Sequence, residues 1–191
     1  MLEKPNFYSV IIGTELLNGR RIDAHFAFLN QQLLSRGWEQ KASFVINDDT
    51  NLMENIFNLI KSDPNSVMFC FGGIGSTPDD YTRQIAANAF TNGAMEFHET
   101  ALTNILEKFG TEAYPHRINM AYLPINAKLL KNVVNNVSGF YLEDRFFFTP
   151  GFPSMSQAMV IEALDKLYPK SNIEKYRKVM TINASENDLI D

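Results

Sequence analysis

A glycine-rich segment with two acidic residues is the clearest candidate for chemistry in this sequence. It reads Gly72-Gly73-Ile74-Gly75-Ser76-Thr77-Pro78-Asp79-Asp80 and directly follows an apolar run at 67–71. Glycines lack a Cβ, so their amides can approach a ligand closely and the chain can adopt a positive φ at little cost. The two carboxylates could hold a divalent metal, and a phosphate beside them would need a cation such as Mg²⁺ in between. The segment therefore predicts a site for a phosphate, a polar ligand or a metal ion.

A purely structural role for the same residues is the alternative. Thr77 has the side chain of an N-cap, Pro78 suits the first position of a helix, and Asp79 and Asp80 would face the positive end of its dipole. Thr77 and Asp80 also have the spacing of a capping box. On this interpretation, one or both acids only stabilise a helix that begins at Pro78.

The elements that must position this segment alternate between strands and helices. Apolar runs predict strands at 7–12, 42–46 and 66–71, with helices between them. This alternation predicts an α/β fold whose mostly parallel sheet has helices on both faces and binds ligands at the carboxyl ends of its strands. The residues expected to face inward are Ile22, Phe26, Leu29 and Leu33 on the first helix, which stops at Gly37, and Leu52, Ile56, Leu59 and Ile60 on the second, which Thr50 caps.

The second half of the chain predicts further elements around a long loop. A helical face at 102–109 is closed by Gly110, a loop follows at 111–126, and two short strands at 140–142 and 145–149 predict a hairpin. A rigid turn at 150–153 then leads into a helix capped by Ser154, and a last strand is expected at 177–182. The residues expected inward on that helix are Met155, Met159, Ala163, Leu164 and Leu167.

Composition sets outer bounds on the class of protein. The 191 residues include 45% hydrophobic and 12% aromatic residues, enough for one core, and we expect one domain with a tail. The net charge is −5 and no Lys/Arg cluster stands out, which argues against nucleic acid as a partner. No apolar run of about 18 residues could span a membrane, and no signal core begins the chain. We therefore expect a cytoplasmic location and no membrane contact.

Cysteine and histidine add little to the candidate site. The single cysteine, Cys70, lies inside an apolar run and is interpreted as a small core residue. His25, His98 and His116 lack metal-ligand spacing, so each is interpreted as a surface or packing residue.

Four motifs in the same order carry a resemblance to a known family. They are Ile12-Gly13-Thr14-Glu15-Leu16-Leu17-Asn18-Gly19-Arg20, Asp48-Asp49, the glycine-rich segment at 72–80, and Pro150-Gly151-Phe152-Pro153-Ser154-Met155. Together they resemble the molybdopterin-binding domain family, with the fold of MoaB and MogA, and within it most closely the N-terminal domain of CinA-like (competence/damage-inducible) proteins. The resemblance implies a three-layer α/β/α sandwich over residues 1–168, with residues 169–191 as a strand and tail.

The resemblance also implies two possible functions. Relatives use the glycine-rich loop and its acids to bind a pterin phosphate in molybdenum cofactor biosynthesis, which would make this chain a binding module for molybdopterin or a related nucleotide. In the CinA-like branch the domain is associated with metal-dependent hydrolysis of nucleotide diphosphates such as ADP-ribose, which would make it a pyrophosphatase. Both chemistries need a phosphate held between backbone donors and a metal. We favour binding as the description and leave turnover open.

Site residues carry over from the family motifs position by position. Asp48 and Asp80 are the candidate catalytic pair and, with Glu15, the candidate ligands of Mg²⁺ or a similar ion; Glu15 could instead cap its own turn. Asn18, Gly19 and Arg20 are expected to close the pocket. The candidate ligand-binding residues are Gly13, Thr14, Glu15, Gly72, Gly73, Gly75, Ser76, Thr77, Pro150 and Gly151.

The sequence departs from the family pattern in several places. Ser76 replaces a usual proline, Met155 replaces a glutamate, and residues 132–139 match the usual Asn-Pro-Val-Gly stretch only loosely, so substrate contacts there are in doubt. No amidase domain is expected after residue 191, and hence no deamidation of nicotinamide nucleotides. Relatives associate as dimers or trimers, so a homo-oligomer is expected. The run Phe146-Phe147-Phe148 could feed its interface, or alternate members could face the core of a strand.

Overall fold

A computed structural model describes residues 2, 4–170, 178–179, 181–183 and 185 of the protein. Its central sheet consists of β1 (Asn6–Ile12), β2 (Gln40–Ile46), β3 (Ser66–Phe71), β6 (Lys128–Leu130), β7 (Gly139–Leu142) and β8 (Phe146–Thr149). The order across the sheet is β2-β1-β3-β8-β7-β6. The pairs from β2 to β8 are parallel, and the pairs of β7 with β8 and with β6 are antiparallel. The predicted α/β class with a mostly parallel sheet is therefore confirmed.

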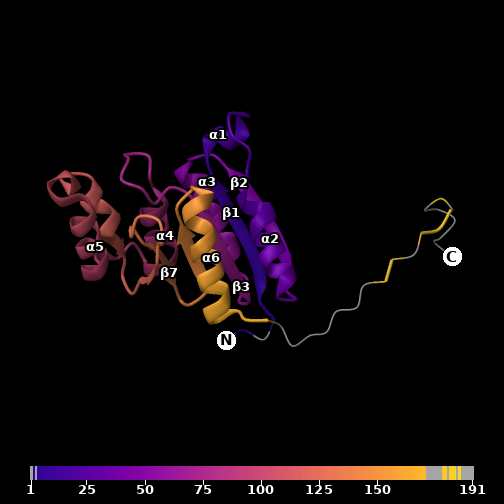
Figure 1. The fold of residues 1–191 in the computed structure, drawn as a ribbon. Helices are drawn as coiled ribbons and strands as arrows, with labels where there is room; N and C mark the ends of the chain where they lie inside the picture. Colours follow the sequence, from indigo (N-terminus) through magenta and orange to yellow (C-terminus); the bar gives the residue numbers. More distant parts are fainter. Residues whose placement is uncertain (1, 3, 171–177, 180, 184, 186–191) are drawn as a thin grey trace.

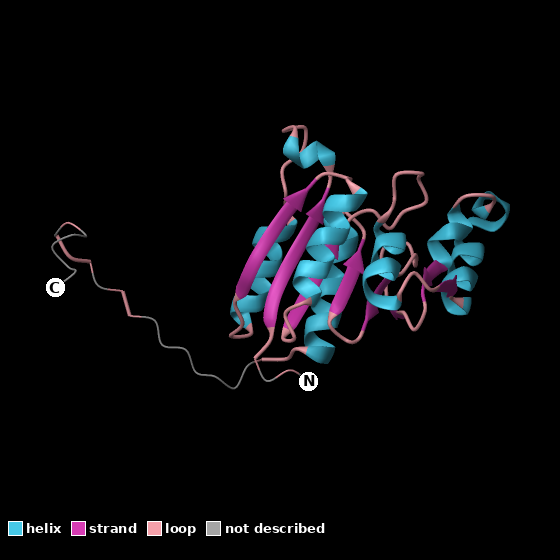
Figure 2. Cartoon of the chain, turned by 180° about the vertical axis from the view of Figure 1, so that it is seen from behind, coloured by secondary structure: helices cyan, strands magenta, loops and turns pink. Residues whose placement is uncertain are grey.

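Helices cover both faces of the sheet and complete three layers. They are α2 (His25–Ser35) and α6 (Pro153–Leu167) on one face and α3 (Thr50–Lys61) and α4 (Thr82–Thr91) on the other. The short α1 (Thr14–Leu17) follows β1, and α5 (Glu99–Phe109) lies outside these layers. α6 lies in front of the sheet in Figure 1, and the view from behind in Figure 2 shows helices over the opposite face. One core joins α2 and α6 to the sheet, and a second core joins α3 and α4 to it.

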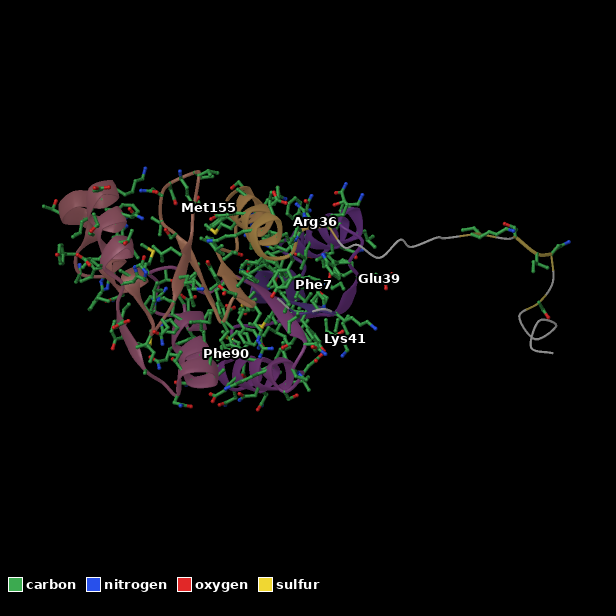
Figure 3. The ribbon with its side chains drawn as sticks, turned by 90° about the horizontal axis from the view of Figure 1, so that it is seen from below. Phe7, Arg36, Glu39, Lys41, Phe90 and Met155 are labelled. Atoms are coloured by element: carbon green, nitrogen blue, oxygen red, sulfur yellow. The ribbon has the colours of Figure 1, made fainter. Side chains whose placement is uncertain are left out.

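Alternate side chains of the central strands enter these two cores. Phe146 and Phe148 pack toward α3 and α4, whereas Phe147 packs toward α2 and α6. Phe7 and Phe90, labelled in Figure 3, belong to these opposite layers. All three phenylalanines of the 146–148 run are 0% exposed, so the suggestion that this run feeds an oligomer interface is wrong and its core role is confirmed. Cys70 is likewise fully buried in the core.

A small lobe extends from the carboxyl end of α4, beyond the edge of the main sheet. It contains α5, two 3-10 turns at 110–113 and 117–121, and a two-stranded antiparallel sheet of β4 (Met95–Phe97) and β5 (Tyr122–Pro124). The lobe lies on the left in Figure 1. The prediction of a loop throughout 111–126 is therefore wrong, and β4 and β6 were also missed. Strands of three residues are too short to show a period of two in the sequence.

The helix after the glycine-rich segment begins later than predicted. α4 starts at Thr82 rather than at Pro78. The Asp80 carboxylate accepts hydrogen bonds from the amide and the hydroxyl of Thr77, at 2.7 and 2.5 Å, and closes a turn before the helix. Thr77 and Asp80 do pair as expected of a cap, but the pair holds a loop.

Some predicted caps and inward faces also differ from the structure. Asp49 rather than Thr50 caps α3, by accepting from the amide of Leu52, and Phe152 rather than Ser154 occupies the N-cap position of α6. Four residues expected inward are exposed, namely Ile22, Phe26, Leu52 and Leu59, while Met53 and Phe57 are buried instead. The interior of α3 is thus shifted by one residue around the helix.

The end of the chain leaves two predictions without a full test. The strand expected at 177–182 lies partly outside the described residues, and its described members, Lys178, Val179, Thr181 and Ile182, are not in a strand. Most of the predicted tail at 169–191 also lies outside them. Among the described residues, no helix has both the length and the apolar character needed to cross a membrane.

The carboxylate of Asp63 connects the amino ends of β1, β2 and β3, at the end of the sheet opposite the predicted site. Asp63 Oδ2 accepts from Asn6 Nδ2 and Tyr8 Oη at 2.8 Å and from Lys41 Nζ at 3.0 Å, and Oδ1 accepts from the amide of Asn65 at 3.0 Å. Burial alone would raise the pKa of Asp63, but these donors together hold it well below its usual value. The ionised carboxylate therefore stabilises the folded chain at neutral pH.

We expect Asp63→Asn to lower the free energy of unfolding by about 1–3 kcal/mol at neutral pH, because the charged acceptor of four donors is lost. The pKa of Asp63 is lower in the folded chain, so its contribution exists above the ordinary aspartate pKa and fades as the pH falls below about 4. Denaturant unfolding of both proteins at pH 7 and pH 3 measures this. A difference between wild type and variant that does not shrink in acid would contradict the assignment.

Candidate functional site

The carboxyl ends of four parallel strands meet around one cleft of about 490 Å³. Register sets this meeting point, because Ile12 pairs with Ile46 and Phe71 pairs with Thr149 at the last positions of their strands. The amide of Gly13 donates to the carbonyl of Ile46 at 2.9 Å, so the ladder continues one residue past the end of β1. The loops that follow these strands therefore start side by side.

Most of the residues predicted for the site line this cleft. Thr14 does not line it, because its amide and hydroxyl instead donate to the Asp48 carboxylate at 3.1 and 2.7 Å. The lining includes Gly13, Glu15, Asp48, Gly72, Gly73, Gly75, Ser76, Thr77, Asp80, Pro150 and Gly151.

The carbonyls of the glycine loop, defined as residues 72–76, are held by the start of α4. Thr82 Oγ1 donates to the carbonyl of Gly72 at 2.9 Å, and the amide of Thr82 donates to the carbonyl of Gly73 at 3.0 Å. Arg83 Nη1 donates to the next two carbonyls of the loop. Four successive carbonyls thus point toward the first turn of one helix.

The amides of the glycine loop consequently point the other way. In a trans peptide the N–H is directed opposite to the C=O, so the amides of residues 73–76 are directed away from Thr82 and Arg83. Within the described part of the chain, these four amides have no protein acceptor. Successive amides of this kind form a concave site that binds anions.

Two glycines of the loop cannot be replaced without distortion. Gly73 has φ +68, and a Cβ there would lie 2.2 Å from Thr82 Oγ1. Gly72 has φ +105, and a Cβ there would lie 2.7 Å from the carbonyl oxygen of Ile12. A Cβ on Gly151 would lie 3.3 Å from the Cα of Gly72, so the second predicted turn packs directly on the first.

Arg83 holds the glycine loop from a buried position. Its side chain belongs to a residue only 9% exposed, and burial lowers its pKa while the nearby Asp80 raises it. A buried guanidinium needs acceptors for its N–H groups, and the loop carbonyls supply them. The cation therefore lies directly behind the open amides.

The three predicted acids have separate partners. The Oδ2 atom of Asp48 accepts from Thr14 and that of Asp80 accepts from Thr77, so each acid fastens its own loop. Glu15 lies 3.7 Å from Arg21 in an ion pair. Among the described residues, no group of three or more His, Cys, Asp or Glu side chains is arranged to hold a metal.

Several lining residues were missed from the sequence. Arg21 lines the cleft, whereas Asn18, Gly19 and Arg20, which were expected to close it, do not. The other missed lining residues come from the small lobe, from the segment at 132–139 and from the start of α6. They are Phe109, Arg117, Met120, Asn132, Asn135, Val137, Ser138 and Met155. The sequence signalled only the last two of these segments, through the loose match at 132–139 and through Met155 in place of the usual glutamate.

Comparison with known families identifies the family to which this fold belongs. Residues 9–169 match the family described as "Probable molybdopterin binding domain". The chain belongs to the molybdopterin-binding domain family.

Curated relatives of this family domain include CinA-like proteins. A protein of Caldivirga maquilingensis is 32% identical over 84% of this chain and 64% of its own length. CinA-like proteins of Geotalea uraniireducens and Leptospira biflexa are 34% and 31% identical, over 80% and 96% of this chain and 37% and 49% of their own lengths. The chain thus spans less than two thirds of each of these relatives.

Solved structures share the fold of the molybdopterin-binding domain seen here. The CinA protein of Thermoplasma acidophilum, described as having unknown function, has a TM-score of 0.76 and 26% identity over 86% of this chain and 98% of that chain. MoaB of Thermus thermophilus has a TM-score of 0.52 and 14% identity over 86% and 91%, which shows the fold alone. Both bear out the expected MoaB/MogA-type architecture.

His25 packs behind the cleft of the domain and supports the second turn. Its ring stacks on Phe71 with centroids 4.4 Å apart. Nε2 lies 3.3 Å from the carbonyl of Gly151, and Nδ1 lies 3.3 Å from Ser156 Oγ. These partners fit a neutral ring that donates from Nε2 and accepts at Nδ1. Burial lowers the pKa of His25, and the bond to Gly151 only partly opposes this, so its packing role is confirmed.

We expect the domain to lose stability as the pH falls below the ordinary histidine pKa of 6.5. In that range the unfolded chain takes up a proton that buried His25 does not, so the free energy of unfolding decreases. His25→Gln should make the pH dependence between about pH 7.5 and 5.5 shallower in chemical denaturation. The exposed His116, changed to Gln, is the control. If the free energy of unfolding changes with pH equally steeply in wild type and in His25→Gln, this role of His25 is refuted.

Proposed function

We propose that the cleft binds the phosphate of a pterin or nucleotide, of the molybdopterin type, on the glycine loop. The observation that carries this proposal is the row of amides at residues 73–76, which have no protein acceptor within the described chain while their neighbouring carbonyls are held by Thr82 and Arg83. Backbone amides fixed in this way are complementary to phosphate oxygens. Their fixed orientation removes much of the ordering cost of binding.

The size of the cleft agrees with a small phosphorylated ligand, and its charge agrees once a cation is included. Arg83 lies behind the loop and Arg21 and Arg117 line the cleft, but Glu15, Asp48, Asp79 and Asp80 line it too, so a phosphate there needs a cation between itself and the acids. A volume of about 490 Å³ falls within the range of small-molecule sites.

Family names point to the same class of ligand. MoaB of Thermus thermophilus is described as a molybdopterin biosynthesis enzyme, and MoaB of Pyrococcus furiosus as a tungsten cofactor synthesizing protein. A role linked to the biosynthesis of such a cofactor, with the pterin as ligand, is therefore part of the proposal.

Asp48 and Asp80 are the proposed ligands of a divalent metal, with Glu15 as a third candidate. Both aspartates line the cleft, and each has one carboxylate oxygen engaged by a threonine. Mg²⁺ usually binds one or two protein carboxylates and completes its shell with substrate phosphates and water, so the pair fits this metal. A bound cation would neutralise charge between the carboxylates and the phosphate. The alternative activity is hydrolysis of a diphosphate such as ADP-ribose, and the same two aspartates would be its catalytic residues. No contact among the described residues of the cleft favours this hydrolysis over binding alone.

The glycine loop can be tested with inorganic pyrophosphate as the probe. We expect Arg83→Met to lower its affinity at least about tenfold in calorimetry, because the loop carbonyls lose their donor and the cleft loses a cation. Thr82→Val removes only the hydroxyl that donates to the carbonyl of Gly72 and leaves the charge unchanged, so it should weaken binding severalfold. Arg36→Met, which loses an ion pair with Asp165 on α6, is the control. Wild-type affinity in both loop variants, with folding verified by circular dichroism, would overturn the proposal.

Magnesium dependence tests the acids separately. We expect Mg²⁺ to raise the affinity of wild type for pyrophosphate, and Asp48→Asn or Asp80→Asn to abolish most of that increase. Without Mg²⁺ these variants should bind at least as tightly as wild type, because one repelling charge is gone. Asp165→Asn serves as the control. Formation of AMP and ribose 5-phosphate from ADP-ribose, measured in the same samples, shows whether turnover accompanies binding. An unchanged Mg²⁺ effect in both variants would exclude the pair as metal ligands.

A further inference from the structure

Part of the cleft lining differs in character from the glycine loop. Apolar side chains of Phe109, Met120, Val137 and Met155 form this part, which is called the apolar wall. Met155 belongs to the first turn of α6 and is labelled in Figure 3. Such surfaces accommodate flat rings, and a thioether packs well against an aromatic ring. These side chains share one cleft with the glycine loop, so they are available to the ring of a ligand whose phosphate lies on the loop.

Two asparagines of the 132–139 segment are engaged in very different ways. Asn132 is 2% exposed and satisfied at both ends, because Nδ2 donates to Asn135 Oδ1 at 2.6 Å and to the carbonyl of Val137 at 3.0 Å, and Oδ1 accepts from the amide of Val134 at 3.0 Å. Its role is to fold the segment. It has no donor to spare for a ligand.

Asn135 is satisfied at its oxygen only. Oδ1 accepts from Asn132 Nδ2 at 2.6 Å and from the amide of Val137 at 3.0 Å. Two donors at this atom fix which end of the carboxamide is oxygen, because a flipped amide would face donor to donor. The Nδ2 group must then occupy the other position.

The Nδ2 group of Asn135 has a weak partner. Among the described residues it contacts only Met155 Sδ, at 3.8 Å, and a thioether is a poor acceptor. Asn135 lines the cleft next to Met155 and Val137. The fold thus orients an amide donor beside the apolar wall, and no oxygen or nitrogen of the described chain accepts from it.

We propose that Asn135 Nδ2 is a specificity-determining donor that binds an acceptor on the ring edge of the ligand. The inference rests on the proposed phosphate site, because the phosphate brings the ring to this wall. The matching chemistry is a phosphorylated heterocycle with a carbonyl oxygen or ring nitrogen on its edge, such as the aminopyrimidinone edge that pterins and guanine share. Asn132 and the amide of Val137 pre-orient the donor, so its direction is set before the ligand arrives.

A single-atom exchange tests this donor. Asn135→Asp keeps the oxygen that accepts from Asn132 and Val137 and replaces only the NH₂ group by an oxygen. Asn136→Asp is the matched control, because the neighbouring residue is exposed, does not line the cleft and tolerates aspartate at its positive φ of 62. Calorimetry would use 6-hydroxymethylpterin monophosphate, guanosine 5′-monophosphate and inorganic pyrophosphate, which lacks a ring.

We expect Asn135→Asp to weaken binding of a ring ligand about tenfold more than it weakens binding of pyrophosphate. Asn136→Asp should change both affinities by the same factor, since it alters only the charge. A selective loss for the pterin, for the guanine nucleotide or for both supports the inference and identifies the source of the ring. Equal losses for ring ligands and pyrophosphate in Asn135→Asp would overturn it.

The same measurements distinguish failure of the proposed phosphate site from failure of the Asn135 donor. If pyrophosphate fails to bind wild type while a ring ligand binds and depends on Asn135, the phosphate site is wrong and the donor stands. If pyrophosphate binds and ring ligands do not respond selectively to Asn135→Asp, the donor is wrong and the phosphate site stands. If no ligand binds wild type, both are overturned.

Discussion

The common end of four parallel strands is the constraint on which the rest of this structure depends. Backbone pairing aligns Ile12 with Ile46 and Phe71 with Thr149, so that the loops leaving these strands emerge at one level. The register cannot slip by one residue, because β3 and β8 are buried on both faces and a slip would exchange their two sets of phenylalanines between the cores. The register of the sheet therefore fixes the relative positions of site residues that come from distant segments of the chain.

The glycine loop shows how local chemistry uses that framework. Delaying the start of α4 to Thr82 leaves Thr82 and Arg83 able to reach back to the loop carbonyls, and the amides face the cleft as a result. Burying a guanidinium is costly unless its donors find acceptors, and here two loop carbonyls accept from its Nη1 group. Loop and helix therefore depend on each other. The loop carbonyls accept hydrogen bonds from the buried guanidinium of Arg83, and these bonds fix the orientation of the loop amides toward an anion.

Much of the fold was predictable because apolar runs in the sequence correspond to buried segments of the structure. The strands at 7–12 and 66–71 and the hairpin near 140–149 were located correctly, since strands buried on two faces are continuous apolar runs. The strand at 42–46 was located as well, although its residues are alternately half-buried and exposed up to Ile46. The start of α4 was not, because an amide of a threonine that donates to an acid three residues later occurs in this turn as well as in a capping box. The inner face of α3 was misplaced for a similar reason, since Leu59 and Phe57 are both apolar and only packing selects which one is buried.

The sequence alone determined the α/β class, the glycine loop and the acids near it, because each depends on neighbours in the chain: an apolar run, a glycine that permits a positive φ, a carboxylate three residues from a threonine. Only the tertiary structure decided which atoms of these residues remain available and what faces them. Arg83 orients the loop through contacts across the first turn of α4, and Phe109, Met120 and Asn135 reach the cleft from segments with no glycine or acidic motif. Their positions follow from long-range packing and from hydrogen bonds that fix one end of a carboxamide, and neither leaves a periodic or local pattern in the sequence.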